Sequence, residues 1–395
     1  MFRRLSGHTR RILSGPLSFS LLFSVFIILV LTFQLSSRPA SLSVSESDTV
    51  KQAQSLHQIE NNPVNAPYNL FLYLVHHVSS NSVFLLRLPS VILAAILILF
   101  FYKLCKAWFG KTIALLGSAI FATTPIFLIS ARQVSTGVMF FSLISIMYIY
   151  LWLSKSEENS QIAFLIMLGI SALLLYTPGF IWWLIAAVIL CWSSLSEQAS
   201  EISKKMLFLA FLLFLIIITP LVFESIKDWR IIQQLTLVPT HFMSPFEVLK
   251  NMGWMVSSLF IKTPYHSLLL VDRLPIFGLV QLALCVFGSF AMWTSARTKL
   301  LLLLSNIGFS ILVAGLNNDL AMLALGVPAA VLLMCAGLRY LYIEWKNVFP
   351  LNPIAKSFAI VLLLIVTLVQ LSFGIRYSLI VWPHSLGTKA NSVIK

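Results

Sequence analysis

The sequence predicts an all-α, polytopic transmembrane helix bundle, and three observations lead to this fold class. Of the 395 residues, 59% are hydrophobic and 10% are charged, which is more apolar surface than a water-soluble core of this length can bury. Apolar runs of about 20 residues, long enough to cross a bilayer as helices, recur along the whole chain. These runs lack the period-two alternation of an outer-membrane barrel. Each is long enough to form a helix, which satisfies its own backbone hydrogen bonds in lipid, so the spans are expected to be helical.

About eleven spans are expected, and the chain reads as one integral membrane domain over residues 1–395. The expected spans are 17–35, 84–103, 113–130, 136–153, 161–176, 179–194, 206–223, 274–293, 300–316, 321–340 and 357–375. The first follows a basic segment, as the apolar part of a signal peptide does, but no A-x-A cleavage site comes after it. We therefore expect it to be a retained span.

The net charge of +14 is explained by the positive-inside rule rather than by nucleic-acid binding. With the N-terminus inside, the short inner loops hold a series of basic residues: Lys103, Lys106, Lys111, Lys155, Lys204, Lys205, Arg297, Lys299, Lys346 and Lys356. This distribution predicts a plasma-membrane protein with a cytoplasmic N-terminus and a short extracytoplasmic tail, residues 376–395. The sequence contains no soluble basic domain that would bind a nucleic acid.

Only two outer loops, 36–83 and 224–273, are long enough to be more than connectors, so function is expected there. In the first, the apolar residues of YNLFLYLVHHV recur at helical spacing over a stretch too short to span the membrane. Interfacial helices that lie along the outer membrane surface are therefore expected in this loop. The second loop holds a similar segment, VLKNMGWMVSSLFI.

The interiors of the expected spans are nearly free of charge. A proton- or ion-coupled transporter usually keeps ionisable groups at mid-membrane, where each charge costs at least about 2.5 kcal/mol and is retained for function. Most of the thirteen acids fall instead in the loops that the topology places outside. This pattern argues against a coupled transporter, and against a channel for the same reason.

Four stretches carry a combination of motifs: DTVKQAQSLHQIENNPVNAPYNLFLYL, LLRLPSVILAAILILFFYKLCKAWFGKTIALLGSAIFATTPIFLISARQ, LLLYTPGFIWWLIAAVIL and LAMLALGVPAAVLLMCAGL. Together they resemble the C-type lipid-linked-sugar glycosyltransferases. The specific resemblance is to glycosyltransferase family 39, with the protein O-mannosyltransferases and lipid A aminoarabinose transferases. The likeness extends over roughly residues 15–345, and it implies the C-type membrane fold.

Three positions depart from the family pattern. Thr49 replaces the second member of the family's leading acidic pair, and Gly137 stands where an acid is common at the start of the fourth span. The sequence Thr177, Pro178, Gly179 occupies the place where many relatives have Thr-Lys-Gly. Two acids and a lysine of the family pattern are thus missing from this chain.

The resemblance implies a reaction in which a hexosyl group moves from a polyprenyl-phosphate donor to an acceptor hydroxyl. A carboxylate within hydrogen-bond reach of the hydroxyl can take its proton, and Asp48, at the family's acid position, is the expected catalytic base. The departing lipid phosphate needs stabilising positive charge, for which a guanidinium is suited by geometry. The expected donor-phosphate ligands are Arg132, Arg87 and Lys51.

Three further polar residues are expected to contact substrate: His76, Glu60 and Asp319. Each also has an ordinary alternative role, for example a helix cap in the case of Asp319. We expect no metal site and no cofactor, because the family's second acid is replaced in this chain. A divalent cation stays an alternative that these residues do not favour.

The predicted function is a membrane glycosyltransferase that acts at the extracytoplasmic face. Its partners would be the polyprenyl-phosphate sugar, membrane lipid, and an acceptor that is a protein, a lipid or a cell-wall polymer. Two alternatives stay open: a non-catalytic, lipid-carrier-binding member of the same fold, and a lipid flippase or transporter. The missing acids and lysine favour the first alternative, and the uncharged spans weigh against the second.

Overall fold

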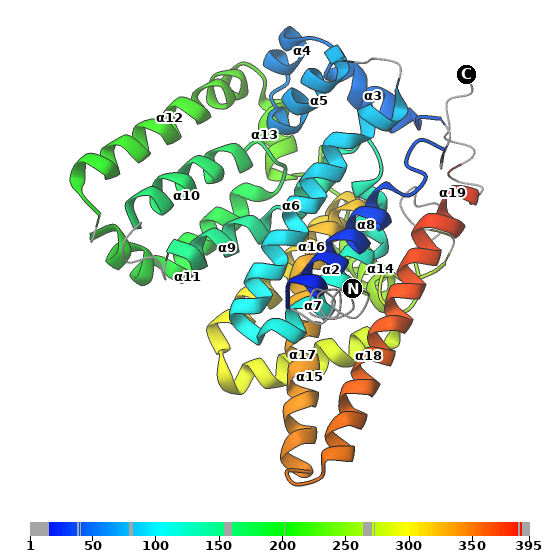
Figure 1. Ribbon diagram of the computed structural model, residues 1–395. Coiled ribbons are helices and arrows are strands. Elements are labelled where there is room, and N and C mark those ends of the chain that lie inside the picture. Colours follow the sequence, from blue (N-terminus) through cyan, green and yellow to red (C-terminus); the bar gives the residue numbers. More distant parts are fainter. Residues whose placement is uncertain are drawn as a thin grey trace, which may run out of the picture.

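The computed structural model describes residues 16–37, 39, 41–78, 82–153, 160–200, 202–263, 271, 273–385 and 388. In these residues the chain is built from helices and contains no β-strand beyond a single bridge position (Figure 1). The short helices α3 (Val44–Gln52), α4 (Leu56–Asn61) and α5 (Ala66–Val78) gather at one end of the bundle. The turn between α17 (Val327–Val348) and α18 (Pro353–Ile375) lies at the other end.

The helix bundle confirms the predicted fold class. Among the residues that the structure describes, five helices are long and apolar enough to cross a membrane: α6 (Val83–Phe109), α12 (Lys204–Lys227), α16 (Arg297–Asn317), α17, and the run Ser357–His384 that contains most of α18. Shorter apolar helices supply further segments: α2 (Pro16–Thr32), α9 (Leu143–Leu153), α10 (Ser160–Leu174), α11 (Phe180–Ser200) and α15 (Leu279–Ser295). Together with the bent pair described next, they coincide with the predicted spans.

The third predicted span, expected as one helix over 113–130, is broken. It consists of α7 (Lys111–Thr123) and α8 (Pro125–Ala131), which meet at an angle of 66°. The break falls at Thr124, because the ring of Pro125 removes a backbone donor and disfavours helical geometry in the residue before it. The bend turns the end of this span, with Arg132, toward the segment that follows α2.

Three other predicted spans also differ in detail. The fourth and the tenth open with 3₁₀ segments, η1 (Thr136–Phe141) and η2 (Leu320–Leu325), before α9 and α17 begin. The last span does not end at residue 375, because the chain continues helically through η3 (Arg376–Val381) and α19 (Trp382–His384). The first part of the expected outer tail is therefore an extension of the helix.

Helix α17 forms the centre of the bundle, where every residue from Val327 to Leu338 is buried. It lies directly against α15 through two glycines. A Cβ atom on Gly288 would stand 1.9 Å from the backbone oxygen of Leu333, and one on Gly337 would stand 2.1 Å from that of Leu284. The two backbones are thus in contact, as is typical of small residues at helix interfaces in membranes.

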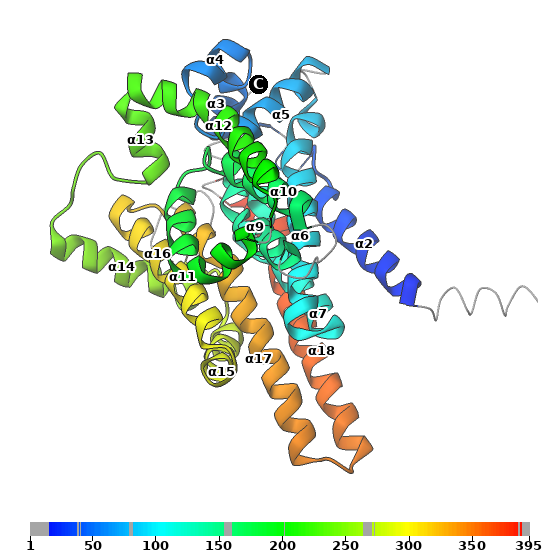
Figure 2. The same cartoon turned by 90° about the vertical axis from the view of Figure 1, so that its left-hand side faces the viewer.

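The described parts of the two loops that were predicted to be outer contain helices, as expected for the first. The second holds α13 (Trp229–Thr236) and the amphipathic α14 (Pro245–Phe260), which includes all but the last residue of the segment VLKNMGWMVSSLFI. Figure 2 shows α13 and α14 on the same side of the molecule, away from α2 and α18. Phe246 and Leu249 of α14 are exposed, as expected for a helix that faces lipid at the membrane surface.

Candidate functional site

Asp48, the predicted catalytic base, lies on the exposed face of α3. Its carboxylate is 3.3 Å from the ammonium group of Lys51, one turn further along the same helix, and both side chains are more than half exposed. The structure therefore brings the predicted base and one predicted phosphate ligand together on the exposed face of α3. Their roles in catalysis stay predictions.

Glu46, two residues before Asp48, is buried and was not singled out from the sequence. Each carboxylate oxygen accepts two hydrogen bonds: Oε1 from Arg87 and the backbone of Val134, and Oε2 from Arg87 and the backbone of Ser43. Ser43 and Glu46 also form the capping box that starts α3. This one side chain joins the first outer loop to α6 and to the chain that follows α8.

Arg87 is completely buried on α6, and its donors are taken up by protein groups. Nε and Nη2 bind Glu46 at 2.9 and 3.1 Å, and the other bonds go to the backbone oxygens of Leu35, Pro39 and Ser41. A guanidinium has five N–H donors, so all of them are used. Phosphate binding by Arg87 stays a prediction that would require these bonds to be replaced.

Arg132, at the end of α8, closes the C-terminal end of α2. Its Nη1 donates to the backbone oxygens of Val30 and Leu31, and its Nη2 donates to that of Phe33. Burial and the nearby charge of Arg87 lower the pKa of Arg132 to about 10, so it stays charged at neutral pH. The positive side chain stabilises the negative end of the α2 dipole, and its part in donor binding stays a prediction.

The remaining predicted contact residues lie apart from one another. Glu60 is exposed on α4, and His76 is half-buried near the end of α5. Asp319 accepts a hydrogen bond from the backbone of Ala321 at 2.9 Å and so caps η2, which is the alternative role given for it above. No direct contact links these three residues to Asp48 within the described part of the chain.

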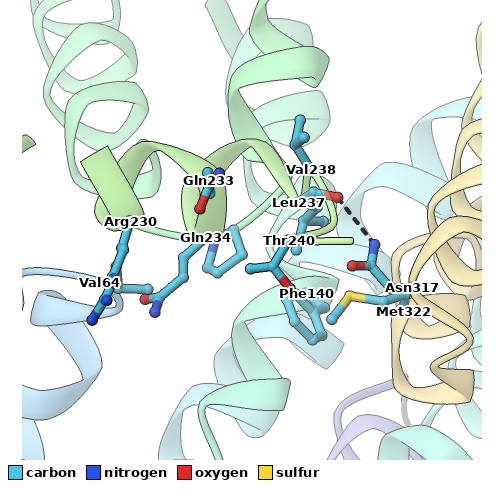
Figure 3. A pocket seen from close by; sticks show the side chains of 11 residues that line it. Val64, Phe140, Arg230, Gln233, Gln234, Leu237, Val238, Thr240, Asn317 and Met322 are labelled. Atoms are coloured by element: carbon cyan, nitrogen blue, oxygen red, sulfur yellow. Dashed lines mark hydrogen bonds between the residues drawn. The ribbon is translucent and has the colours of Figure 1, made fainter. Parts of the chain in front are cut away.

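A cavity of about 440 Å³ lies beside α13, within the range of small-molecule binding sites (Figure 3). Its walls come from the first outer loop, the turn before α11, α13 and its extension, the end of α16, and two 3₁₀ segments. The lining residues are Val64, Phe140, Pro178, Arg230, Gln233, Gln234, Leu237, Val238, Thr240, Asn317 and Met322. None of the site residues predicted from the sequence is among them.

The turn from Tyr176 to Gly179 holds two walls of this cavity together. The backbone oxygen of Tyr176 accepts a 2.8 Å bond from the backbone of Asn65, in the first outer loop. The backbone nitrogen of Gly179 donates a 2.8 Å bond to Leu235 of α13. Gly179 has φ +80°, a conformation that favours glycine, and an added Cβ would stand 2.7 Å from the side chain of Leu237.

Helix α13 presents its polar face to the cavity. Arg230, Gln233 and Gln234 recur at helical spacing, while Ile231 and Leu235 on the opposite face are buried. Figure 3 shows Arg230 and Gln234 extending from α13 toward Val64. Across the cavity, Asn317 donates to the backbone oxygen of Leu237 at 3.0 Å.

The guanidinium of Arg230 forms no hydrogen bond or ion pair with any residue that the structure describes, although its backbone is held by the cap residue Asp228. Arg230 thus differs from Arg87 and Arg132, whose guanidinium groups donate hydrogen bonds to other residues of the chain. The sequence signal for this site was the three-and-four spacing of polar residues in WRIIQQLT. The cavity itself depends on segments distant in sequence and has no such signal.

The chain is similar to known proteins in sequence over part of its length and in fold over most of it. A family model for dolichyl-phosphate-mannose-protein mannosyltransferases matches residues 62–223, which include part of the first outer loop and the turn at Gly179. No curated protein matches the sequence significantly.

Two solved structures of ArnT from Cupriavidus metallidurans are similar to this chain in three dimensions. The apo structure has a TM-score of 0.59 at 13% identity and covers 96% of this chain and 76% of its own. The structure bound to undecaprenyl phosphate has a TM-score of 0.58 at 12% identity and covers 95% and 76%. The predicted resemblance is confirmed at the level of architecture: the chain has the C-type glycosyltransferase fold, in the arrangement of family 39 and ArnT.

Proposed function

We propose that this protein is a membrane glycosyltransferase that moves a hexosyl group from a polyprenyl-phosphate donor to an acceptor hydroxyl at the extracytoplasmic face. The observation that carries the proposal is the cavity beside α13, in which Arg230 has no protein partner among the described residues. The similar fold of an ArnT bound to undecaprenyl phosphate supports a lipid carrier of this class. The N-terminus would be cytoplasmic, with α3 to α5, α13 and the C-terminus outside.

Arg230 is the cation best placed to bind the donor phosphate. Two phosphate oxygens accept parallel N–H bonds from one guanidinium, and such charge-assisted bonds are stronger than neutral ones. The positive charge also stabilises the phosphate as it leaves, when its negative charge increases. The polyprenyl tail would stay in the bilayer beside the bundle, and the sugar would enter the cavity.

Asp48 is the proposed base. As the anomeric carbon bonds to the acceptor oxygen, its bond to the phosphate oxygen breaks, and the acceptor proton passes to the carboxylate of Asp48. The exposure of Asp48 on α3 suits an acceptor that arrives from outside the membrane. Asp48 does not line the cavity, so the anomeric carbon of the bound sugar would have to stand at the cavity mouth, where one acceptor hydroxyl reaches both this carbon and the carboxylate.

The test is release of undecaprenyl phosphate from undecaprenyl-phosphate sugars by the purified protein, with an envelope extract as acceptor. The wild type should be compared with Asp48→Asn and Arg230→Gln, and with Lys250→Gln on exposed α14 as a matched control. We expect Asp48→Asn to lower the rate by about 10²-fold or more. Arg230→Gln should weaken donor binding, and Lys250→Gln should behave as wild type. Full activity of Asp48→Asn would show that the proposed base is wrong.

A second candidate is a protein that binds the lipid carrier without turning it over. It is favoured by one observation, that the described residues lining the cavity include no carboxylate. This candidate predicts that undecaprenyl phosphate binds and that Arg230→Gln weakens the binding, while no donor is cleaved. Release of lipid phosphate in the presence of acceptor would exclude it.

A further inference from the structure

Among the described residues that line the cavity, only Arg230 is charged. The other polar residues of this lining are neutral: Gln233, Gln234, Thr240 and Asn317. A ligand therefore meets one cation and a set of amide and hydroxyl groups, and none of these described residues offers a carboxylate to a positively charged sugar.

The amide groups have atoms left for a ligand. Both amide hydrogens of Asn317 are used, one on Leu237 and one on Val313, so its Oδ1 is the atom offered as an acceptor. Gln233 and Gln234 bond to Val238 and Leu237 through their backbone oxygens, and their side chains form no hydrogen bond with the described residues. A glutamine amide both donates and accepts, as a sugar hydroxyl does.

Apolar side chains complete the binding surface. Phe140 and Met322 lie on the wall opposite Arg230 and Gln234, below Asn317 in Figure 3. A ring face and a thioether pack against the C–H face of a sugar, while the amides hydrogen-bond at its edge. The lining therefore suits an uncharged ring with several hydroxyl groups.

Resting on the proposed function, we infer that the cavity selects a donor whose sugar is neutral and excludes a sugar with a free amino group. A sugar ammonium would lose its water on entering a cavity where no described carboxylate receives it. The selectivity would come from Gln233, Gln234 and Asn317, which offer neutral amide groups in place of a carboxylate.

The experiment uses two matched probes, undecaprenyl phosphate carrying glucose and the same lipid carrying glucosamine, which differ by one hydroxyl against one ammonium. Their competition with labelled undecaprenyl phosphate is measured on the purified full-length protein in detergent, so that the readout is binding and does not need turnover. We expect the glucose lipid to compete about tenfold better or more. Gln233→Glu or Gln234→Glu should remove most of this preference, because each places a carboxylate beside the cavity. Gln58→Glu, on exposed α4, is the matched control and should retain it.

The outcomes separate this inference from the function on which it rests. Equal or tighter binding of the glucosamine lipid would overturn the inference while leaving a polyprenyl-phosphate binding protein in place. Failure of undecaprenyl phosphate itself to bind would overturn both. The glutamate variants could bind unlabelled undecaprenyl phosphate as tightly as the wild type does and still keep the full preference for the glucose lipid. In that case the sugar selectivity does not come from the glutamines of α13. Retained carrier binding in each variant shows that it is folded.

Discussion

Arg87 and Glu46 form a buried ion pair with two hydrogen bonds, Nε to Oε1 at 2.9 Å and Nη2 to Oε2 at 3.1 Å. Their side chains are 0% and 1% exposed. The pair connects α6 to the first turn of α3, and the same carboxylate holds the backbone of Val134. It therefore sets where the exposed face of α3, with Asp48, stands relative to the bundle.

Breaking this pair should be strongly destabilising. Glu46→Gln leaves the guanidinium of Arg87 buried without its counter-charge, and we expect a loss of about 3–5 kcal/mol of unfolding free energy. Thermal unfolding in detergent would measure it. Asp48→Asn removes the exposed pair with Lys51 and should cost less than about 1 kcal/mol. The double variant Glu46→Gln, Arg87→Met should recover part of the loss, and no recovery would mean that the charge imbalance is not the cause.

Gly179→Ala should disturb the cavity wall. The residue has φ +80°, and the new methyl group would meet Leu237, so we expect a cost of about 1–3 kcal/mol and weaker binding of undecaprenyl phosphate. Gly308→Ala in α16 is the control, because a Cβ there has no neighbour within 4 Å. Unchanged carrier binding in Gly179→Ala would contradict the proposed link between this turn and the cavity.

The contact between α15 and α17 should not tolerate a methyl group. Alanine at Gly288 or Gly337 would place a Cβ within 1.9 or 2.1 Å of a backbone oxygen on the facing helix, and backbone cannot move aside as a side chain can. We expect each variant to lose about 3 kcal/mol, seen as a lower thermal midpoint. Gly253→Ala, with open space around its Cβ, should match or exceed wild-type stability.

Chelation should leave the reaction unchanged. The two acids of α3 are both engaged, since Glu46 accepts four hydrogen bonds and Asp48 pairs with Lys51. Release of undecaprenyl phosphate in EDTA should therefore equal its release in buffer alone. Loss of release in EDTA, followed by recovery with Mg²⁺ or Mn²⁺, would contradict this prediction.

The helical segments were predictable because length and hydrophobicity alone decide them. Each predicted span coincides with an apolar helix, and the errors lie where local geometry intervenes, as at Pro125 and at the helical extension beyond Ile375. Such breaks depend on how a proline or a π turn packs against neighbouring helices, which the apolar pattern does not record.

The site was harder to predict, and the acids of α3 show why. Sequence spacing and the family motif pointed to Asp48, yet the acid that the fold buries is Glu46. The capping-box pattern from Ser43 to Glu46 was the available signal. Arg87 and Arg132 were predicted as donor-phosphate ligands, and this role stays a prediction. Most of the partners that they have in the structure are backbone oxygens, which no sequence motif reveals.

Two backbone hydrogen bonds hold the turn at Pro178 to the walls of the cavity, between Tyr176 and Asn65 on one side and between Gly179 and Leu235 on the other. The side chain at position 178 takes no part in these bonds, yet it lines the cavity. This residue can therefore be exchanged without dismantling the walls, which makes position 178 a natural starting point for altering ligand preference by directed evolution.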